Sequence, residues 1–255
     1  MNQGRGLIAA ALTPRGKRGE LNFGACFELL DHLSKAQVHG IALLTAAGEY
    51  PAFAIEERTR LIYLGVKRSR VPILAGAGAE DLATAVGLAR EALSAGAQGV
   101  VLPPPLLFAY PPADLREYYL QFAGQLGRGA EIWVDGAPGA EEIMASGHFA
   151  GVVGAGLTLC AEACAIPELL VALDCARRTG DSARHERLAL LANEFRERAN
   201  QFAPLVAIKV ATGVRGIAMG SLPVPVAPEA APLVDEFRDW FRTWYPKARK
   251  ATDHA

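Results

Sequence analysis

Short apolar runs alternate with longer amphipathic segments through the first 160 residues of the chain. Each run ends in a turn that contains Gly, Pro or Thr, and most turns lead into a segment with apolar residues at helical spacing. This alternation is typical of parallel strands joined by right-handed crossover helices. The pattern predicts six strands, at residues 7–12, 41–44, 71–75, 99–102, 131–134 and 150–153.

The segments between and after these runs have the pattern of amphipathic helices. Asn22 and Asp81 are N-cap residue types at the starts of two of them, and Gly96 follows the end of the second. After about residue 158 the chain is predicted to be helical throughout. The predicted helices cover residues 22–36, 55–68, 81–95, 113–126, 158–179, 182–202, 204–212 and 228–247.

Together these patterns predict an α/β fold that is like a TIM barrel but incomplete. A closed barrel of this kind needs eight strands, and six are recognisable. We expect a shortened (β/α) barrel over residues 1–158 and a helical segment over 159–255. The two parts are expected to pack as one structural unit.

Charge and composition exclude several classes of partner. The formal net charge is −1 and the charged residues are mixed along the chain, which argues against nucleic acid or an anionic membrane surface. The first apolar run is too short to span a membrane and lacks the layout of a signal peptide, so a cytoplasmic protein is expected. The chain has four cysteines in no metal-binding pattern, so we expect buried, reduced thiols and neither metal nor cofactor.

The turns after the predicted strands contain almost no catalytic side chains. Parallel α/β folds place their chemistry in these turns. The six turns begin at residues 13–14, 45–49, 76–78, 103–105, 135–136 and 154–156, and none of these stretches contains Lys, His, Cys or Arg.

The second turn carries a resemblance to a known family. Residues 40–49 read Gly-Ile-Ala-Leu-Leu-Thr-Ala-Ala-Gly-Glu, and a helix with Glu56-Glu57-Arg58 follows. This resembles the strand, Gly-Thr-Thr-Gly-Glu turn and Glu-Glu-Arg helix of the dihydrodipicolinate synthase and N-acetylneuraminate lyase family. Further similar stretches occur in the same order, at residues 11–14, 71–78, 95–99 and 207–213.

The resemblance implies an eight-stranded barrel with three extra C-terminal helices and lyase or aldolase activity. Members of the family bind pyruvate or another 2-oxo acid as a Schiff base on a lysine at the end of strand six. A tyrosine at the end of strand five relays protons, and two threonines of the strand-two turn hold the carboxylate. An amine, a phenol and hydroxyl groups are what this chemistry needs.

This sequence departs from the family at each of those positions. The paired threonines correspond to Ala46 and Ala47, and the tyrosines expected after strand four correspond to Pro105 and Leu106. Residues 131–136 best resemble the family's seventh strand. Two βα units, or about 60 residues, would then be missing, together with the tyrosine and the lysine.

In an alternative alignment residues 131–138 form strand five, and Trp133 or Val134 occupies the tyrosine position. The imine-forming lysine is absent in either case. Lys209 matches a helical lysine of the family that does not form the imine. The chain's lysines are Lys17, Lys35, Lys67, Lys209, Lys247 and Lys250.

Three weak catalytic candidates remain at the strand ends, Glu49, Thr13 and Asp135. Each has a structural alternative. Glu49 is expected to bond N–H groups of its turn, Thr13 to cap its own turn, and Asp135 to form an Asx turn before Gly136. None is therefore assigned as catalytic with assurance.

The candidate ligand-binding residues lie in two loops. The strand-two turn provides Thr45, Ala46, Ala47 and Gly48. Tyr110 follows strand four, where neighbouring prolines indicate a packing role as an alternative. The resemblance makes a 2-oxo acid or a sugar acid the expected ligand.

Three hypotheses follow. The first is a family member that has lost Schiff-base chemistry and binds or senses a small 2-oxo acid. The second is a lyase that acts on 2-oxo or sugar acids without an imine, which requires the three candidates in one polar pocket and an unfilled barrel centre. The third is a homo-oligomeric assembly module, because missing strands would leave sheet edges that proteins normally cover.

Overall fold

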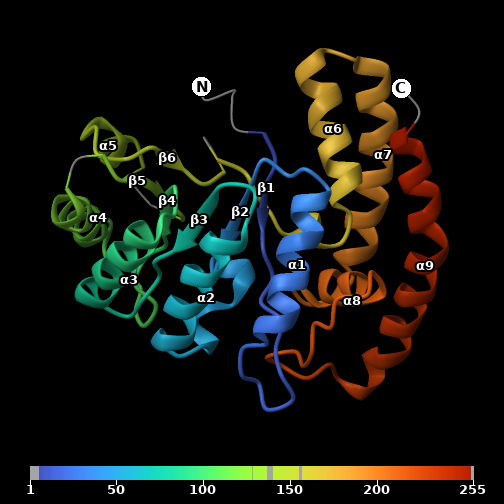
Figure 1. Ribbon diagram of the computed structural model, residues 1–255, viewed down its shortest axis with the longest axis horizontal. Coiled ribbons are helices and arrows are strands. Elements are labelled where there is room, and N and C mark those ends of the chain that lie inside the picture. The colour runs from blue at the N-terminus through green and yellow to red at the C-terminus, as the bar shows by residue number, and fades with distance from the viewer. Residues whose placement is uncertain (1–5, 128, 137–139, 155–156, 254–255) are drawn as a thin grey trace.

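The computed structural model describes residues 6–127, 129–136, 140–154 and 157–253. Within them, one curled sheet of parallel strands has helices packed along its outside (Figure 1). The strand order is β6-β5-β4-β3-β2-β1-β7. The predicted α/β, TIM-barrel-like class with C-terminal helices is confirmed. The strands are β1 Ile8–Ala10, β2 Gly40–Leu43, β3 Ile73–Gly76, β4 Gly99–Leu102, β5 Glu131–Val134, β6 Gly151–Val152 and β7 Leu159–Cys160.

The helices begin and end close to the predicted positions. The side chains of Asn22 and Asp81 accept hydrogen bonds from Ala25 N–H and Thr84 N–H, so both predicted N-caps are confirmed. The helices are α1 Phe23–Lys35, α2 Ile55–Arg68, α3 Leu82–Ala95, α4 Pro112–Leu126, α5 Ala140–Ala145, α6 Pro167–Thr179, α7 Ser182–Ala199, α8 Val206–Val214 and α9 Ala231–Asp253. The short α5 was not predicted.

The prediction of a helix over residues 158–179 is wrong at its start. Leu159–Cys160 forms strand β7, which pairs with β1 in the register Ile8↔Leu159 and Ala9↔Cys160, and α6 begins only at Pro167. Cys160 and Cys164 therefore do not share a helix face. A two-residue strand shows no periodicity in the sequence, and its pairing with residues 150 positions away decides its conformation. Cys175 is exposed, contrary to the expectation of four buried thiols.

The two ends of the sheet approach each other through residues 157–160. Leu157 forms a parallel bridge with Val153, which directly follows β6, and the next residues of the chain form β7 beside β1. The Gly154 N–H donates to the Leu157 carbonyl at 2.7 Å. The chain thus spans the gap between β6 and β1 with its own residues. The turn predicted at 154–156 includes Ala155 and Gly156, which lie outside the described residues.

The inner face of the curled sheet is filled by side chains. One buried cluster takes one residue from each strand β1 to β5 together with Leu157, whereas the alternating residues of the same strands belong to clusters beneath the helices. Trp133 is the largest member and is fully buried. The strand residues of this inner cluster are Ile8, Ala42, Leu74, Val101 and Trp133.

The C-terminal helices form a compact layer beside β1 and α1 (Figure 1). Their core is aromatic, with Phe195 of α7 packed edge-on against Phe241 of α9 at a centroid distance of 5.9 Å. Phe237, Phe241 and Trp244 are buried within this chain. The buried aromatic side chains of the last helix are therefore part of the chain's own core.

The indole of Trp133 occupies the space that a side chain at Gly151 would need, so a substitution at Gly151 should be destabilising. A Cβ at Gly151 would lie 2.5 Å from Trp133 Cζ3. Because the indole is enclosed and cannot withdraw, Gly151→Ala is expected to lower the free energy of unfolding by about 1–3 kcal/mol, measured by urea denaturation. Gly87→Ala is the control, because a Cβ there meets no described atom within 4 Å. It should be neutral or gain up to about 1 kcal/mol from helix propensity. A Gly151→Ala protein as stable as the wild type would contradict this packing.

Candidate functional site

The turns after β1 and β2 lie against each other. Thr13 is 1 % exposed, and a Cβ at Gly48 would come within 3.2 Å of its Oγ1 and of the Ala11 carbonyl oxygen. The absence of a side chain at Gly48 therefore allows the two turns to meet. Thr13 and the strand-two turn are brought together, as their positions after neighbouring strands suggest.

The strand-two turn has a strained backbone. Residues Ala46–Gly48 form a single 3-10 turn, and both Leu44 and Glu49 have positive φ angles, 54° and 52°. Left-handed geometry costs a non-glycine residue about 1–2 kcal/mol. Gly76 of β3 accommodates the turn, since a Cβ there would lie 1.9 Å from the Leu44 carbonyl oxygen. Packing against neighbouring turns thus holds Glu49 in its unusual conformation.

Glu49 is the centre of a buried group of three charges. Lys209 Nζ donates to both carboxylate oxygens, at 2.9 and 2.8 Å. Arg15 donates to Glu49 Oε2 through Nε at 3.2 Å and through a terminal nitrogen at 3.1 Å. The side chains of Lys209, Arg15 and Glu49 are 2 %, 7 % and 13 % exposed. The group joins the β1 turn, the β2 turn and helix α8.

Burial lowers the pKa of Lys209, and the hydrogen bonds and charge of Glu49 oppose that shift. Arg15 adds a second positive charge and also lies over the ring of Phe53, 4.7 Å from its centroid. Two cations and one carboxylate leave a net charge of +1. Lys209 is shielded from solvent, and its Nζ donates to both oxygens of Glu49, so a ligand carbonyl has little access to the amine.

The partners of Glu49 differ from those expected. The sequence pointed to N–H groups of its turn, whereas the hydrogen bonds described for its carboxylate come from Arg15 and Lys209. Arg15 was not singled out, because only the first two residues of that turn, Thr13 and Pro14, were considered. The similarity of residues 207–213 to a family segment was the one signal for Lys209.

Asp135 lies in a separate group at the end of β5. It is partly buried, its N–H donates to the Leu102 carbonyl at 2.9 Å, and burial raises the pKa of its carboxyl. Burial also raises the pKa of Tyr50 and Tyr119, and the charge of Asp135 adds to both shifts. Tyr119 Oη is buried and has no hydrogen-bond partner among the described residues. Asp135 is thus grouped with two tyrosines, and no described contact joins it to Glu49 or Thr13.

The two predicted ligand-binding loops differ in burial. Thr45 is 4 % exposed, and its Oγ1 has no hydrogen-bond partner among the described residues. Ala46 beside it is exposed. Tyr110 is 38 % exposed and packs edge-on against Phe108, with 6.4 Å between ring centroids. Its surroundings agree with the packing alternative.

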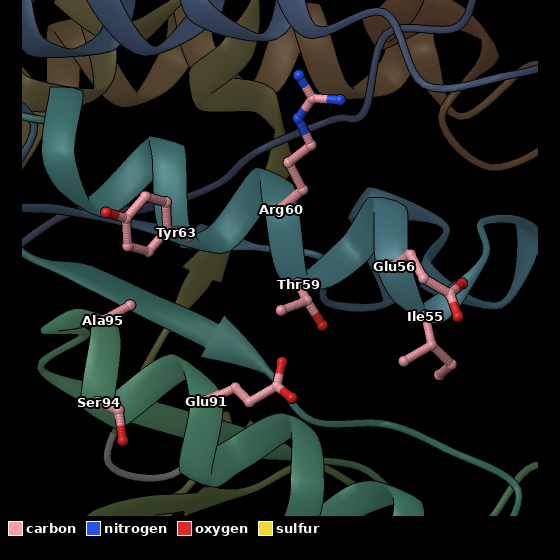
Figure 2. A pocket seen from close by; sticks show the side chains of 8 residues that line it. All are labelled: Ile55, Glu56, Thr59, Arg60, Tyr63, Glu91, Ser94 and Ala95. Atoms are coloured by element: carbon pink, nitrogen blue, oxygen red, sulfur yellow. The ribbon is translucent and has the colours of Figure 1, made fainter.

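Two cavities are relevant to binding. One of about 360 Å³ lies beside Glu49, between the segment that precedes α8 and residues 222–233. The other, of about 700 Å³, is an open groove between α2 and α3 (Figure 2). Thr59 of α2 and Glu91 of α3 lie on its two sides, and Arg60 points away from it. This groove lies on the outer, helical face and not at the strand ends.

The described residues contain no group of three or more His, Cys, Asp or Glu side chains arranged to hold a metal ion. None of the helices within the described ranges has the length and apolar character needed to cross a membrane.

The family model and the curated relatives that match this chain point to the same family. Residues 3–128 match the model of the dihydrodipicolinate synthetase family. A 4-hydroxy-tetrahydrodipicolinate synthase of Gluconacetobacter diazotrophicus is 35 % identical over 103 residues, which are 40 % of this chain and 35 % of the relative. The corresponding enzyme of Azoarcus is 36 % identical over 94 residues, 36 % of this chain and 32 % of the relative. The chain therefore spans about a third of the length of these relatives.

Solved structures share the fold over most of the chain. YagE, a prophage protein of the dihydrodipicolinic acid synthase family from E. coli K12 in complex with pyruvate, superimposes with a TM-score of 0.82 at 20 % identity, over 94 % of this chain and 98 % of that one. A sialic acid aldolase of Ruminococcus gnavus gives a TM-score of 0.81 at 15 % identity, covering 95 % and 99 %.

The group of three charges predicts unequal effects of removing its members. Glu49→Gln leaves two buried cations without a counter-charge, so it is expected to cost about 3–5 kcal/mol of unfolding free energy. Lys209→Met leaves a neutral Arg15–Glu49 pair and should cost less than about 2 kcal/mol. Urea denaturation measures both.

The control for this comparison is Glu142→Gln, which removes an exposed ion pair with Arg116 and should change stability by no more than about 0.5 kcal/mol. A Lys209→Met protein that loses as much stability as Glu49→Gln would show that net charge does not govern the group.

Proposed function

Because the chain is a divergent, shortened member of the dihydrodipicolinate synthase and N-acetylneuraminate lyase family, we propose that it binds a small 2-oxo acid without forming a Schiff base. The observation that supports this proposal is the buried environment of Lys209. It is the lysine that the described structure brings to the strand-two turn, and it is buried in an ion pair with Glu49. An amine enclosed in this way has little access to the carbonyl of a ligand.

The strand-two turn supports binding of a carboxylate. Thr45 offers a buried hydroxyl that has no partner among the described residues, and a buried hydroxyl of this kind gains from a ligand oxygen. The first N–H groups of a helical turn have no carbonyl within the turn to bond. Ala46 and Ala47 supply such groups but no hydroxyls. The turn is thus suited to hold a small anion with fewer donors than the family's paired threonines would provide.

The choice of a 2-oxo acid rests on the relatives. YagE was solved in complex with pyruvate, and its fold agrees with this chain over most of its length. The curated relatives are 4-hydroxy-tetrahydrodipicolinate synthases, but this chain spans about a third of their length. Their whole reaction is therefore not carried over. A lyase acting without an imine is less favoured, because the inner face of the sheet is filled and Asp135 is grouped apart from Glu49 and Thr13.

Pyruvate provides the test of this proposal. At ten times its dissociation constant a ligand stabilises the protein by about 1.4 kcal/mol, which a thermal shift detects. Thr45→Val should remove the shift, and Thr59→Val in the α2–α3 groove should keep it. Borohydride reduction with labelled pyruvate should leave every lysine unmodified. A label on Lys209 would overturn the absence of an imine, and an unchanged shift in Thr45→Val would overturn the site.

A second proposal concerns assembly. The loop between β4 and α4 exposes three large apolar side chains, Leu106, Leu107 and Phe108, at 43 %, 66 % and 70 %. Contiguous exposed apolar surface of this kind marks interaction sites. We infer a homo-oligomer formed through this loop, not through the sheet edges, since residues 157–160 already span the gap between them.

Light scattering tests the oligomer. The wild type is expected to have a mass that is a multiple of the single chain, and Leu107→Ser with Phe108→Ser should reduce it to one chain. Leu190→Ser is the matched control, because Leu190 is 72 % exposed on α7, far along the chain from this loop. A wild type that stays monomeric at high concentration would refute assembly through the loop.

A further inference from the structure

The cavity beside Glu49 has the features of a small-molecule site that uses neither Thr45 nor the N–H groups of the strand-two turn. Its volume of about 360 Å³ lies in the range of ligand pockets. Glu49 and Gln201 are the polar residues in its lining, and the others are apolar. Residues 201–206, which lead into α8, provide one wall, and residues 222–233 provide the other.

The rim of this cavity exposes apolar surface. Val224 is 73 % exposed and Leu233 is 48 % exposed, and both line the cavity. Three prolines, at positions 223, 225 and 228, lie in or beside the second wall and restrict its backbone. An apolar molecule in the cavity would remove these side chains from water without a large loss of backbone freedom.

Glu49 has one acceptor position that its partners leave free. Its Oε2 accepts from Lys209 and from two nitrogens of Arg15, whereas its Oε1 accepts from Lys209 alone. A carboxylate oxygen has two lone-pair positions. The described contacts therefore leave room for one donor at Oε1, and Glu49 is a lining residue of the cavity.

The charges around Glu49 restrict the ligand's own charge. Arg15 and Lys209 lie on the carboxylate but do not line the cavity, so a ligand meets Glu49 first. A carboxylate ligand would face a carboxylate. A cationic ligand would add a third positive charge to a group whose net charge is already +1. An uncharged donor avoids both repulsions.

We propose that this cavity binds an uncharged, largely apolar molecule that donates one hydrogen bond, from a hydroxyl or N–H group, to Glu49 Oε1. The apolar body occupies the space between Val206, Val226 and Leu233. The site does not depend on the proposed 2-oxo acid binding, since it uses neither Thr45 nor the N–H groups of the strand-two turn.

Four probes that differ only in the polar group test the proposal: 3-phenyl-1-propanol, propylbenzene, 3-phenylpropylammonium and 3-phenylpropanoate. Methyl resonances of Leu and Val report binding, because Val206, Leu222, Val224, Val226 and Leu233 all line the cavity. The alcohol should shift these resonances and bind about fivefold more tightly than propylbenzene, as expected for one hydrogen bond. Both charged probes should bind more weakly than the alcohol.

Two variants locate the alcohol in the cavity. Ala230→Trp fills the space, and the adjacent Ala231→Trp adds the same side chain at an exposed residue outside the lining. The first should abolish binding and the second should retain it. Leu233→Gln changes a half-exposed lining residue and should weaken binding severalfold, whereas Leu190→Gln should not.

Three results would overturn the inference. The first is a set of shifted methyl resonances that excludes the cavity residues. The second is equal binding of the alcohol by the wild type and by folded Ala230→Trp or Leu233→Gln. The third is tightest binding of 3-phenylpropanoate or 3-phenylpropylammonium, which would show that an uncharged donor is not what the site selects. Pyruvate should leave the alcohol's affinity unchanged.

Discussion

The arrangement of the turns at the strand ends depends on the buried ion pairs of Glu49 with Arg15 and Lys209. Three charges with little exposure are tolerable only when each has its partners, so the β1 turn, the β2 turn and helix α8 must be placed together. Lys209 and Glu49 are 160 residues apart in the sequence. This contact therefore joins the C-terminal helical layer to the sheet and encloses the Lys209 amine at the same time.

The shortened sheet places a second limit on function. Fewer strands enclose less space, and here the inner face is filled by side chains that include the fully buried indole of Trp133. Gly151 lacks a side chain where that indole lies. The cavity beside Glu49 lies between the start of α8 and residues 222–233, and none of its lining residues belongs to this inner cluster.

Much of this fold follows from local patterns. Six strands and the helix caps at Asn22 and Asp81 were predicted because each depends on residues close in the sequence. Strand β7 was missed because two residues carry no periodicity, and its conformation depends on pairing with β1. The same reason applies to the site. Glu49 was recognised from its turn, but Arg15 and the role of Lys209 depend on contacts between distant segments.

The strand-two turn resembles the family's turn in sequence, but its shape can be explained without catalytic chemistry. Leu44 and Glu49 both occupy left-handed conformations, which cost free energy and persist only where the surroundings impose them. In an active relative such strain would be read as preparation for catalysis. In this chain the turn places Glu49 between Arg15 and Lys209, and the resulting ion pairs are a sufficient reason for its shape. The geometry of the turn can therefore serve the stability of this chain alone.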